Sequence, residues 1–177
     1  DTVRQVADFG PDQVILLPLY PQYSTTTSAS SLKEWEGEAT VAGVTAPSRT
    51  ICCYPQESGF VEATVVRLRE ALREAGQENP PRVLFSAHGL PKKIVDQGDP
   101  YQWQVEQSVA AVVHRLGEVN LDWQICYQSR VGPLEWIGPA TDSEIEKAAA
   151  EGRPIVVVPI AFVSEHSETL VELDIEY

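Results

Sequence analysis

The last segment of the sequence combines a histidine with three regularly spaced carboxylates. His166 and Glu168 follow an apolar run that begins at Pro159, and Glu172 and Glu176 continue the series at four-residue steps. On an α-helix this spacing places the three glutamates along one side, where like charges repel and weaken the helix. Two explanations fit the pattern: a solvated acidic helix face, or a path along which protons or a cation move.

His166 and Glu168 are two residues apart, so a regular helix would turn them to different sides. On a loop or a distorted first turn, both side chains could face one cleft. Glu168 would then act as a metal ligand or a base, and His166 as the partner that orients it. A His-x-Glu pair by itself is more often structural than functional.

A second candidate, His88, directly follows the apolar run 83–86 and precedes Gly89 and Pro91. Glycine permits close backbone approach and proline fixes the turn, so the imidazole is expected at the edge of a cleft. There it could bind a metal or accept a proton, or simply hydrogen-bond a strand end; the loop supports both readings equally. By contrast, His114 lies on the polar side of its expected helix and should be exposed to solvent.

Strands and helices must position these candidate residues. Apolar runs typical of buried strands cover 14–20, 50–54, 83–86, 123–127 and 155–160. Between them, helices are expected at about 32–41, 57–75, 105–116 and 142–150, the last with Thr141 and Asp142 as capping candidates. The alternation predicts an α/β fold with a parallel sheet covered on both faces, in which ligands bind at the carboxyl ends of strands.

Composition narrows the class of protein. The net charge of −13 argues against nucleic acid as a partner, and no apolar run is long enough to span a membrane. The three cysteines have no zinc-site spacing, which indicates thiols in a reducing cytoplasm. There is no methionine, and the final residues read as a continuing helix, so we expect an internal segment of a longer protein.

Five stretches, in order and spanning nearly the whole chain, resemble the bacterial ferrochelatase family. They are Pro18-Leu-Tyr-Pro-Gln-Tyr-Ser24, Phe85-Ser-Ala-His-Gly-Leu-Pro91, Gly98-Asp-Pro-Tyr101, Tyr127-Gln-Ser-Arg-Val-Gly-Pro133 with Trp136, and the terminal run 159–177. The resemblance implies a chelatase-like fold of two doubly wound parallel-sheet domains with a porphyrin cleft between them. Residues 1–56 would form the C-terminal part of the first domain, and 57–177 most of the second, cut within its last helix.

The resemblance also implies roles for particular residues. His88 and Glu168 would face each other across the cleft as catalytic residues and iron ligands, with the division between iron binding and proton transfer left open. Glu172 and Glu176, together with His166, would form an acidic path for protons or metal, on a helix that contains a widened π-type turn.

Three aromatic residues, Tyr20, Tyr23 and Trp136, are matched to the porphyrin pocket, although a tryptophan such as Trp136 more commonly fills a core. The implied reaction inserts ferrous iron into protoporphyrin IX and releases two protons, giving protoheme in the last step of heme synthesis. Iron and porphyrin are then substrates, and no prosthetic group is expected in this segment.

Some questions stay open at this stage. The alternatives are coproporphyrin as the substrate, or a chelatase-like remnant that binds porphyrin or metal without catalysis. The sequence also leaves open an iron–sulfur cluster outside the segment, peripheral membrane association and the oligomeric state. We expect a cytoplasmic protein, and we expect the 177-residue segment by itself to be inactive.

Overall fold

The computed structural model describes residues 2–76, 78–165 and 167–176. In chain order, the elements are α1 (Thr2–Phe9), β1 (Val14–Leu16), α2 (Ser28–Val41), β2 (Ser48–Thr50), α3 (Ser58–Ala75), β3 (Arg82–His88), α4 (Lys92–Asp96), α5 (Tyr101–Leu116), β4 (Trp123–Gln128), α6 (Thr141–Ala150), β5 (Ile155–Pro159) and the π-helix η1 (Glu168–Glu176). The strands pair in parallel in two separate sheets, β1-β2 and β4-β3-β5. The predicted α/β class with parallel pairing is confirmed.

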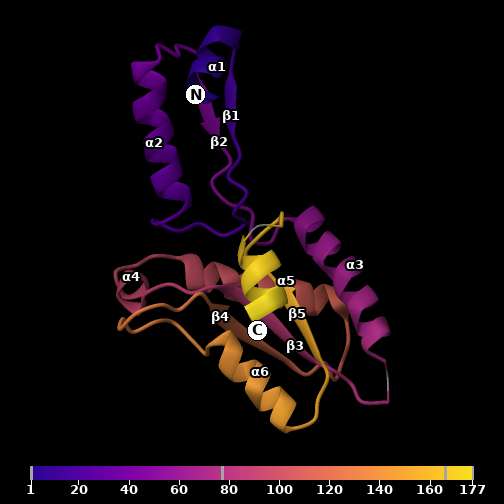
Figure 1. The fold of residues 1–177 in the computed structure, drawn as a ribbon. Helices are drawn as coiled ribbons and strands as arrows, with labels where there is room; N and C mark the ends of the chain where they lie inside the picture. The colour runs from indigo at the N-terminus through magenta and orange to yellow at the C-terminus, as the bar shows by residue number, and fades with distance from the viewer. Residues whose placement is uncertain (1, 77, 166, 177) are drawn as a thin grey trace.

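The larger sheet has β3 at its centre and helices on both faces (Figure 1). Val83, Phe85 and Ala87 of β3 belong to one hydrophobic core with residues of α3 and α5. Ser86 points to the opposite face, since successive side chains alternate along a strand, and its hydroxyl lies 2.9 Å from that of Thr141 in α6. A central strand buried on both faces is what the apolar run around 83–86 predicted.

Helices α3 and α5 pack against each other beneath this sheet. Each buries one side, with Val65 and Leu68 of α3 and Val105 and Val109 of α5 almost fully excluded from solvent. His114 is exposed on the outer side of α5, as predicted. Among the described residues, the structure contains no helix that is both long enough and apolar enough to cross a bilayer.

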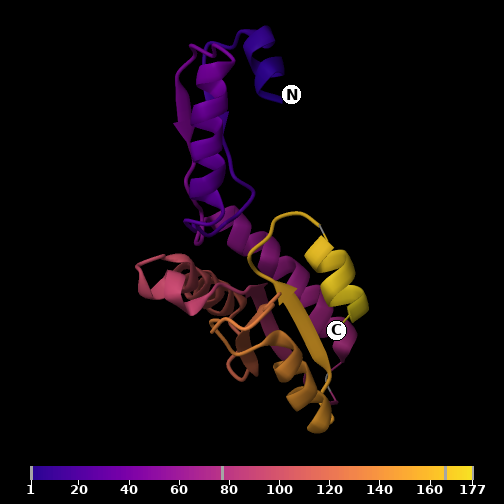
Figure 2. The ribbon, with the colours of Figure 1, turned by 60° about the vertical axis from the view of Figure 1, so that its left-hand side comes forward.

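The first part of the chain has little core of its own. Figures 1 and 2 show α1, α2, β1 and β2 extending away from the body that contains the larger sheet. Within described residues 2–53, Ala39 alone belongs to the buried hydrophobic set, whereas Ile15 of β1 is 63% exposed and Val41 of α2 is 84% exposed. Most contacts that hold this part to the body therefore come from the loops at its near end.

Two strands predicted in this first part differ in extent from the observed ones. The strand expected at 14–20 covers only Val14–Leu16. The strand expected at 50–54 lies at Ser48–Thr50, because it pairs only over the length of β1, from Val14 to Leu16. The residues after Thr50 instead run toward the body, and Tyr54 donates its backbone N–H to Pro21 O in the loop after β1. Two short helices, α1 and α4, were not anticipated.

The expected caps of α6 were also wrong. Ala140 occupies the N-cap position and makes no side-chain cap bond. The Thr141 hydroxyl is used against Ser86 across the sheet, and Asp142 accepts only from the adjacent Ser143 N–H among the bonds described for it. The Thr141 hydroxyl therefore makes a hydrogen bond to the sheet instead of capping the start of α6.

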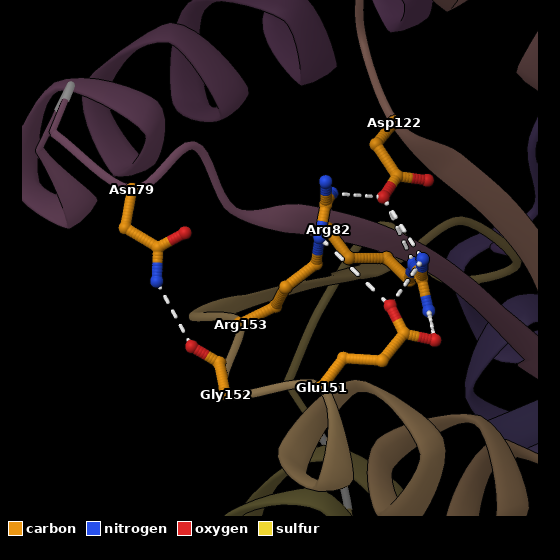
Figure 3. A network of polar contacts seen from close by, with 6 residues as sticks. All are labelled: Asn79, Arg82, Asp122, Glu151, Gly152 and Arg153. Carbon is orange, nitrogen blue, oxygen red and sulfur yellow. Dashed lines mark hydrogen bonds and ion pairs between the residues drawn. The ribbon is translucent and has the colours of Figure 1, made fainter.

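A cluster of charged residues ties together the amino-terminal edge of the larger sheet (Figure 3). Arg82 at the start of β3 donates from Nε to Asp122 at 3.1 Å and from Nη2 to Glu151 at 3.0 Å. Arg153, just before β5, also donates to Asp122. Because the strands are parallel, this cluster lies at the opposite edge from His88, and it fixes the strand starts rather than the candidate site.

Candidate functional site

The structure brings His88 and Glu168 into direct contact. His88 ends β3 and Glu168 begins η1, and the His88 Nδ1 atom lies 2.8 Å from Glu168 Oε2. The two side chains are 42% and 26% exposed, so the pair is partly shielded but reachable from solvent. The family resemblance implied that they face each other across a cleft; here they are hydrogen-bonded partners at the carboxyl end of the sheet.

A buried glutamine holds this pair from below. Gln128 ends β4 directly opposite His88 in the sheet register, is 1% exposed and donates from Nε2 to Glu168 Oε2 at 3.2 Å. The Ser86 hydroxyl donates to Gln128 Oε1 at 2.6 Å, which sets the amide with its N–H groups toward the carboxylate. No local pattern in the sequence singles out Gln128, because its place beside His88 follows from strand register.

The protonation of His88 is biased by its partner. The hydrogen bond to Glu168 raises the pKa of His88 above its usual value, burial opposes the rise, and the charges of Glu168 and Glu172 add to it. In the neutral ring, Nδ1–H donation to the carboxylate leaves Nε2 as the nitrogen with a lone pair. Glu168 therefore both orients the imidazole and stabilises its protonated form.

A cavity of about 140 Å³ lies beside the pair and is closed by residues from both parts of the chain. His88, Glu168 and Tyr101 line it from the body, and Gln22 and Thr27 from the loop that follows β1. Among the described residues, Gln22 Oε1 and Thr27 Oγ1 are buried without a hydrogen-bond partner. Such atoms beside a cavity favour a bound ligand or water that can satisfy them.

The three aromatic candidates take different places. Tyr20 lines the cavity and is 38% exposed. Tyr23 is held against α5, where its backbone N–H donates to Gln104 Oε1 at 2.8 Å. The Trp136 ring lies against Gly89 and lines a separate hollow of about 320 Å³. Gly89 directly follows His88, so Trp136 lies close to the pair while lining a different hollow, and its porphyrin-pocket role stays a prediction.

The acidic series lies on a continuous π-helix rather than an α-helix. Glu168 contacts His88, whereas Glu172 accepts hydrogen bonds from both the backbone N–H and the hydroxyl of Ser129. Glu176 is exposed, and His166 lies outside the described residues. Two of the three glutamates therefore hold the ends of neighbouring strands, in addition to any part in a path.

No resident metal centre is indicated by the side chains that the structure describes. Within residues 2–76, 78–165 and 167–176, no three His, Cys, Asp or Glu side chains are grouped so as to hold a metal ion. The cysteines are free thiols, with Cys126 buried and Cys52 exposed.

A larger cavity lies elsewhere among the described residues and has a different lining. It measures about 800 Å³ and is walled mainly by apolar side chains of α3, β5 and the segments after β1 and β2, among them Leu19, Phe60 and Val158. It touches the smaller cavity at Phe162, which lines both. The imidazole–carboxylate pair lines the smaller cavity and not this one.

Fold and site together define a parallel α/β protein with an imidazole–carboxylate pair beside a small cavity at the carboxyl end of its sheet. The ferrochelatase family model matches residues 1–177, the whole chain. The chain therefore belongs to the ferrochelatase family.

Curated relatives agree with this assignment. The chain is 58% identical to a ferrochelatase of Phenylobacterium zucineum (strain HLK1) and 56% identical to one of Caulobacter vibrioides (strain NA1000 / CB15N), over all 177 residues and 50% of each relative. It is 51% identical to a ferrochelatase of Pelagibacter ubique (strain HTCC1062), again over all 177 residues and 51% of that protein. The chain thus spans about half the length of the curated relatives it matches.

Proposed function

We propose that the full-length protein inserts ferrous iron into protoporphyrin IX and releases two protons. The observation that carries this proposal is the hydrogen-bonded pair of His88 and Glu168 at a small cavity, in a chain that belongs to the ferrochelatase family. The relatives that match the whole length of this chain are named ferrochelatase. Iron and the porphyrin are both substrates in this reaction.

The pair suits the proton chemistry of metal insertion. Two pyrrole N–H protons must leave as Fe²⁺ forms bonds to the four porphyrin nitrogens, so the site needs a base near the macrocycle. His88 Nε2 accepts the two protons in turn in this scheme, the first leaving along the acidic helix before the second is taken, and Glu168 stabilises the imidazolium formed each time. The 2.8 Å contact favours this division of labour, because acting as two separate iron ligands requires the hydrogen bond to open.

The acidic helix supplies the second part of the scheme. Glu172 and Glu176 follow Glu168 along η1 toward an exposed end, so they can pass protons out or guide a cation in. His166 belongs to this path in the proposal. Tyr20 contributes the cavity wall opposite His88, with Tyr23 and Trp136 as further porphyrin contacts.

A chelatase assay on the full-length protein tests the proposal. Zinc-porphyrin fluorescence and anaerobic iron insertion should both show turnover, which His88→Ala and Glu168→Ala should reduce by about a hundredfold or more. His114→Ala is the matched control, because that histidine is exposed on α5. Undiminished turnover in both site variants would refute the assignment of the site.

Parallel assays separate the alternatives. Turnover with coproporphyrin in place of protoporphyrin IX would change the proposed substrate. Tight porphyrin binding without metalation would instead indicate a binding protein.

We also propose a domain boundary between residues 56 and 57, which the separate sheets β1-β2 and β4-β3-β5 support. A cytoplasmic location is part of the same proposal, and the free thiols support it.

A further inference from the structure

One carboxylate outside the His88–Glu168 pair joins the two parts of the chain. Asp99 lies in the turn between α4 and α5 and is only 7% exposed. Its Oδ1 accepts the Tyr101 N–H at 2.9 Å, which begins α5. Its Oδ2 accepts three donors from the loop after β1: the Ser24 hydroxyl at 3.0 Å, the Thr25 N–H at 2.7 Å and the Thr25 hydroxyl at 2.6 Å.

The same loop is anchored at two further points along α5. Gln104 Oε1 accepts the Tyr23 N–H at 2.8 Å, and Ser108 Oγ accepts from Gln22 Nε2 at 2.8 Å. Gln104 and Ser108 are four residues apart and so lie on one side of the helix. Successive residues of the 20–27 loop are thus bound to one edge of the body, and Asp99 is the only charged member of this described set.

The loop held in this way forms one wall of the cavity. Tyr20, Gln22, Ser24, Thr26 and Thr27 line it together with His88 and Glu168, and Tyr101, whose N–H Asp99 also binds, lines it from the body. Gln128 holds Glu168 from the sheet, whereas Asp99 holds the loop. Loss of Asp99 therefore removes contacts of the loop and leaves the Gln128–Glu168 bond in place.

We infer that Asp99 is a positioning residue for the proposed reaction, holding the 20–27 loop in the conformation that receives the porphyrin. The inference rests on the proposed function for its substrate. If the loop is correctly placed only part of the time, the apparent affinity for the ligand falls by that fraction, whereas turnover of the bound complex is preserved. Loss of Asp99 should therefore raise KM for porphyrin and leave kcat nearly unchanged.

The isosteric variant Asp99→Asn gives the sharpest test. An asparagine has one acceptor oxygen, so its NH₂ group must face either the Thr25 N–H or the Tyr101 N–H, neither of which can turn to accept. We expect Asp99→Asn and Asp99→Ala in the full-length protein to raise KM for porphyrin similarly, by about tenfold or more. KM for the metal and kcat should change by less than about threefold.

Asp142→Asn is the matched control, since Asp142 also lies at a helix start but bonds only its neighbour Ser143 among its described contacts. Thr25→Val should weaken binding less than Asp99→Ala, and the double variant should equal Asp99→Ala because the Thr25 hydroxyl then has no carboxylate left to bind. An unchanged KM for Asp99→Asn, or a fall in kcat alone, would overturn the inference.

Hydrogen exchange separates this inference from the proposed function. In the metal-free full-length protein, without porphyrin, amides of the 20–27 loop should exchange about tenfold faster in Asp99→Asn, while those of β3 keep their protection. This outcome supports the positioning role even if no chelatase activity is found. Unchanged exchange in the loop, or equal loss of protection in β3, contradicts it.

Discussion

The Glu172 carboxylate accepts two hydrogen bonds from Ser129, the residue that follows β4: one from its backbone N–H and one from its hydroxyl. Ser129 has a φ of 60°, a left-handed conformation that costs free energy for a residue other than glycine. It directly follows Gln128, which binds Glu168. Glu172 therefore stabilises a strained residue that helps to place the His88–Glu168 pair.

Removing this carboxylate should loosen the end of β4. We expect Glu172→Ala to lower the free energy of unfolding of the full-length protein by about 1.5–3 kcal/mol, because a charge-assisted bond to a strained backbone N–H is lost. Urea unfolding measures this, and exchange of the Ser129 amide should accelerate. Glu176→Ala on the same helix is the control, and an equal effect of both substitutions would contradict the role of Glu172.

The His88 pKa gives a second prediction. Because the hydrogen bond to Glu168 raises the pKa of His88 above 6.5, with Glu168 and Glu172 charges adding to it, Glu168→Gln should lower that pKa. Titration of the imidazole by NMR in the metal-free full-length protein measures it. Glu176→Gln should change it far less, and an unchanged pKa in Glu168→Gln would mean that the pair is not formed in solution.

The same shift predicts how stability depends on pH. A folded-state pKa above the unfolded value means that the pair stabilises the fold fully below about pH 6.5, and that this contribution is lost as pH rises through the folded-state pKa. The difference in urea midpoint between wild type and Glu168→Gln should therefore be larger at about pH 6 than at about pH 9. A difference that grows with pH would contradict it.

How far the sequence predicts this structure differs between elements. The run 83–86 predicts β3 well because both faces of that strand are buried, so its apolar character is continuous. The run 50–54 misleads because Ile51 is apolar yet 46% exposed, and strand length there is set by the short partner β1. Local hydrophobicity carries information only where the residue is buried.

The candidate site divides in the same way. The position of His88 follows from a strand end and a Gly-Leu-Pro turn, both visible locally. Its partners Gln128 and Glu168 depend on sheet register and on a π-helix, which are set by long-range packing. The Asp99 anchor is similarly invisible, because its Oδ2 donors lie 74 and 75 positions away in the chain.

The charged cluster at the other edge of the sheet should contribute to stability without affecting catalysis. Asp122 accepts from Arg82 and Arg153, and its side chain is 33% exposed. Asp122→Asn should lower the free energy of unfolding by about 1–2 kcal/mol, less at high salt, with kcat unchanged. Glu70→Gln, in the exposed Arg67–Glu70 pair, should have no measurable effect on the urea midpoint. Equal midpoints for both variants would refute the role of Asp122.

Gly89 permits a close approach that no other residue can make. A Cβ at this position would lie 2.7 Å from the backbone oxygen of Gln128 and 3.0 Å from Cγ of Arg130, so β4 or the His88 turn would have to move. Gly89 N–H also donates to Gln128 O at 2.7 Å, which ties the residue after His88 to the strand that carries Gln128. We expect Gly89→Ala to destabilise the full-length protein by about 1–3 kcal/mol.

Gly37→Ala is the matched control for that substitution. Gly37 lies within α2, and a Cβ there meets nothing within 4 Å. The substitution should therefore stabilise the protein by about 0.5–1 kcal/mol, because alanine loses less backbone entropy in a helix. Urea unfolding of both variants should give shifts of opposite sign. Because Gly89 adjoins His88, the NMR titration of His88 should change in Gly89→Ala and stay unchanged in Gly37→Ala. Stability changes of the same sign in the two variants, or an unchanged His88 titration in Gly89→Ala, would show that the close approach at Gly89 does not position the His88–Glu168 pair.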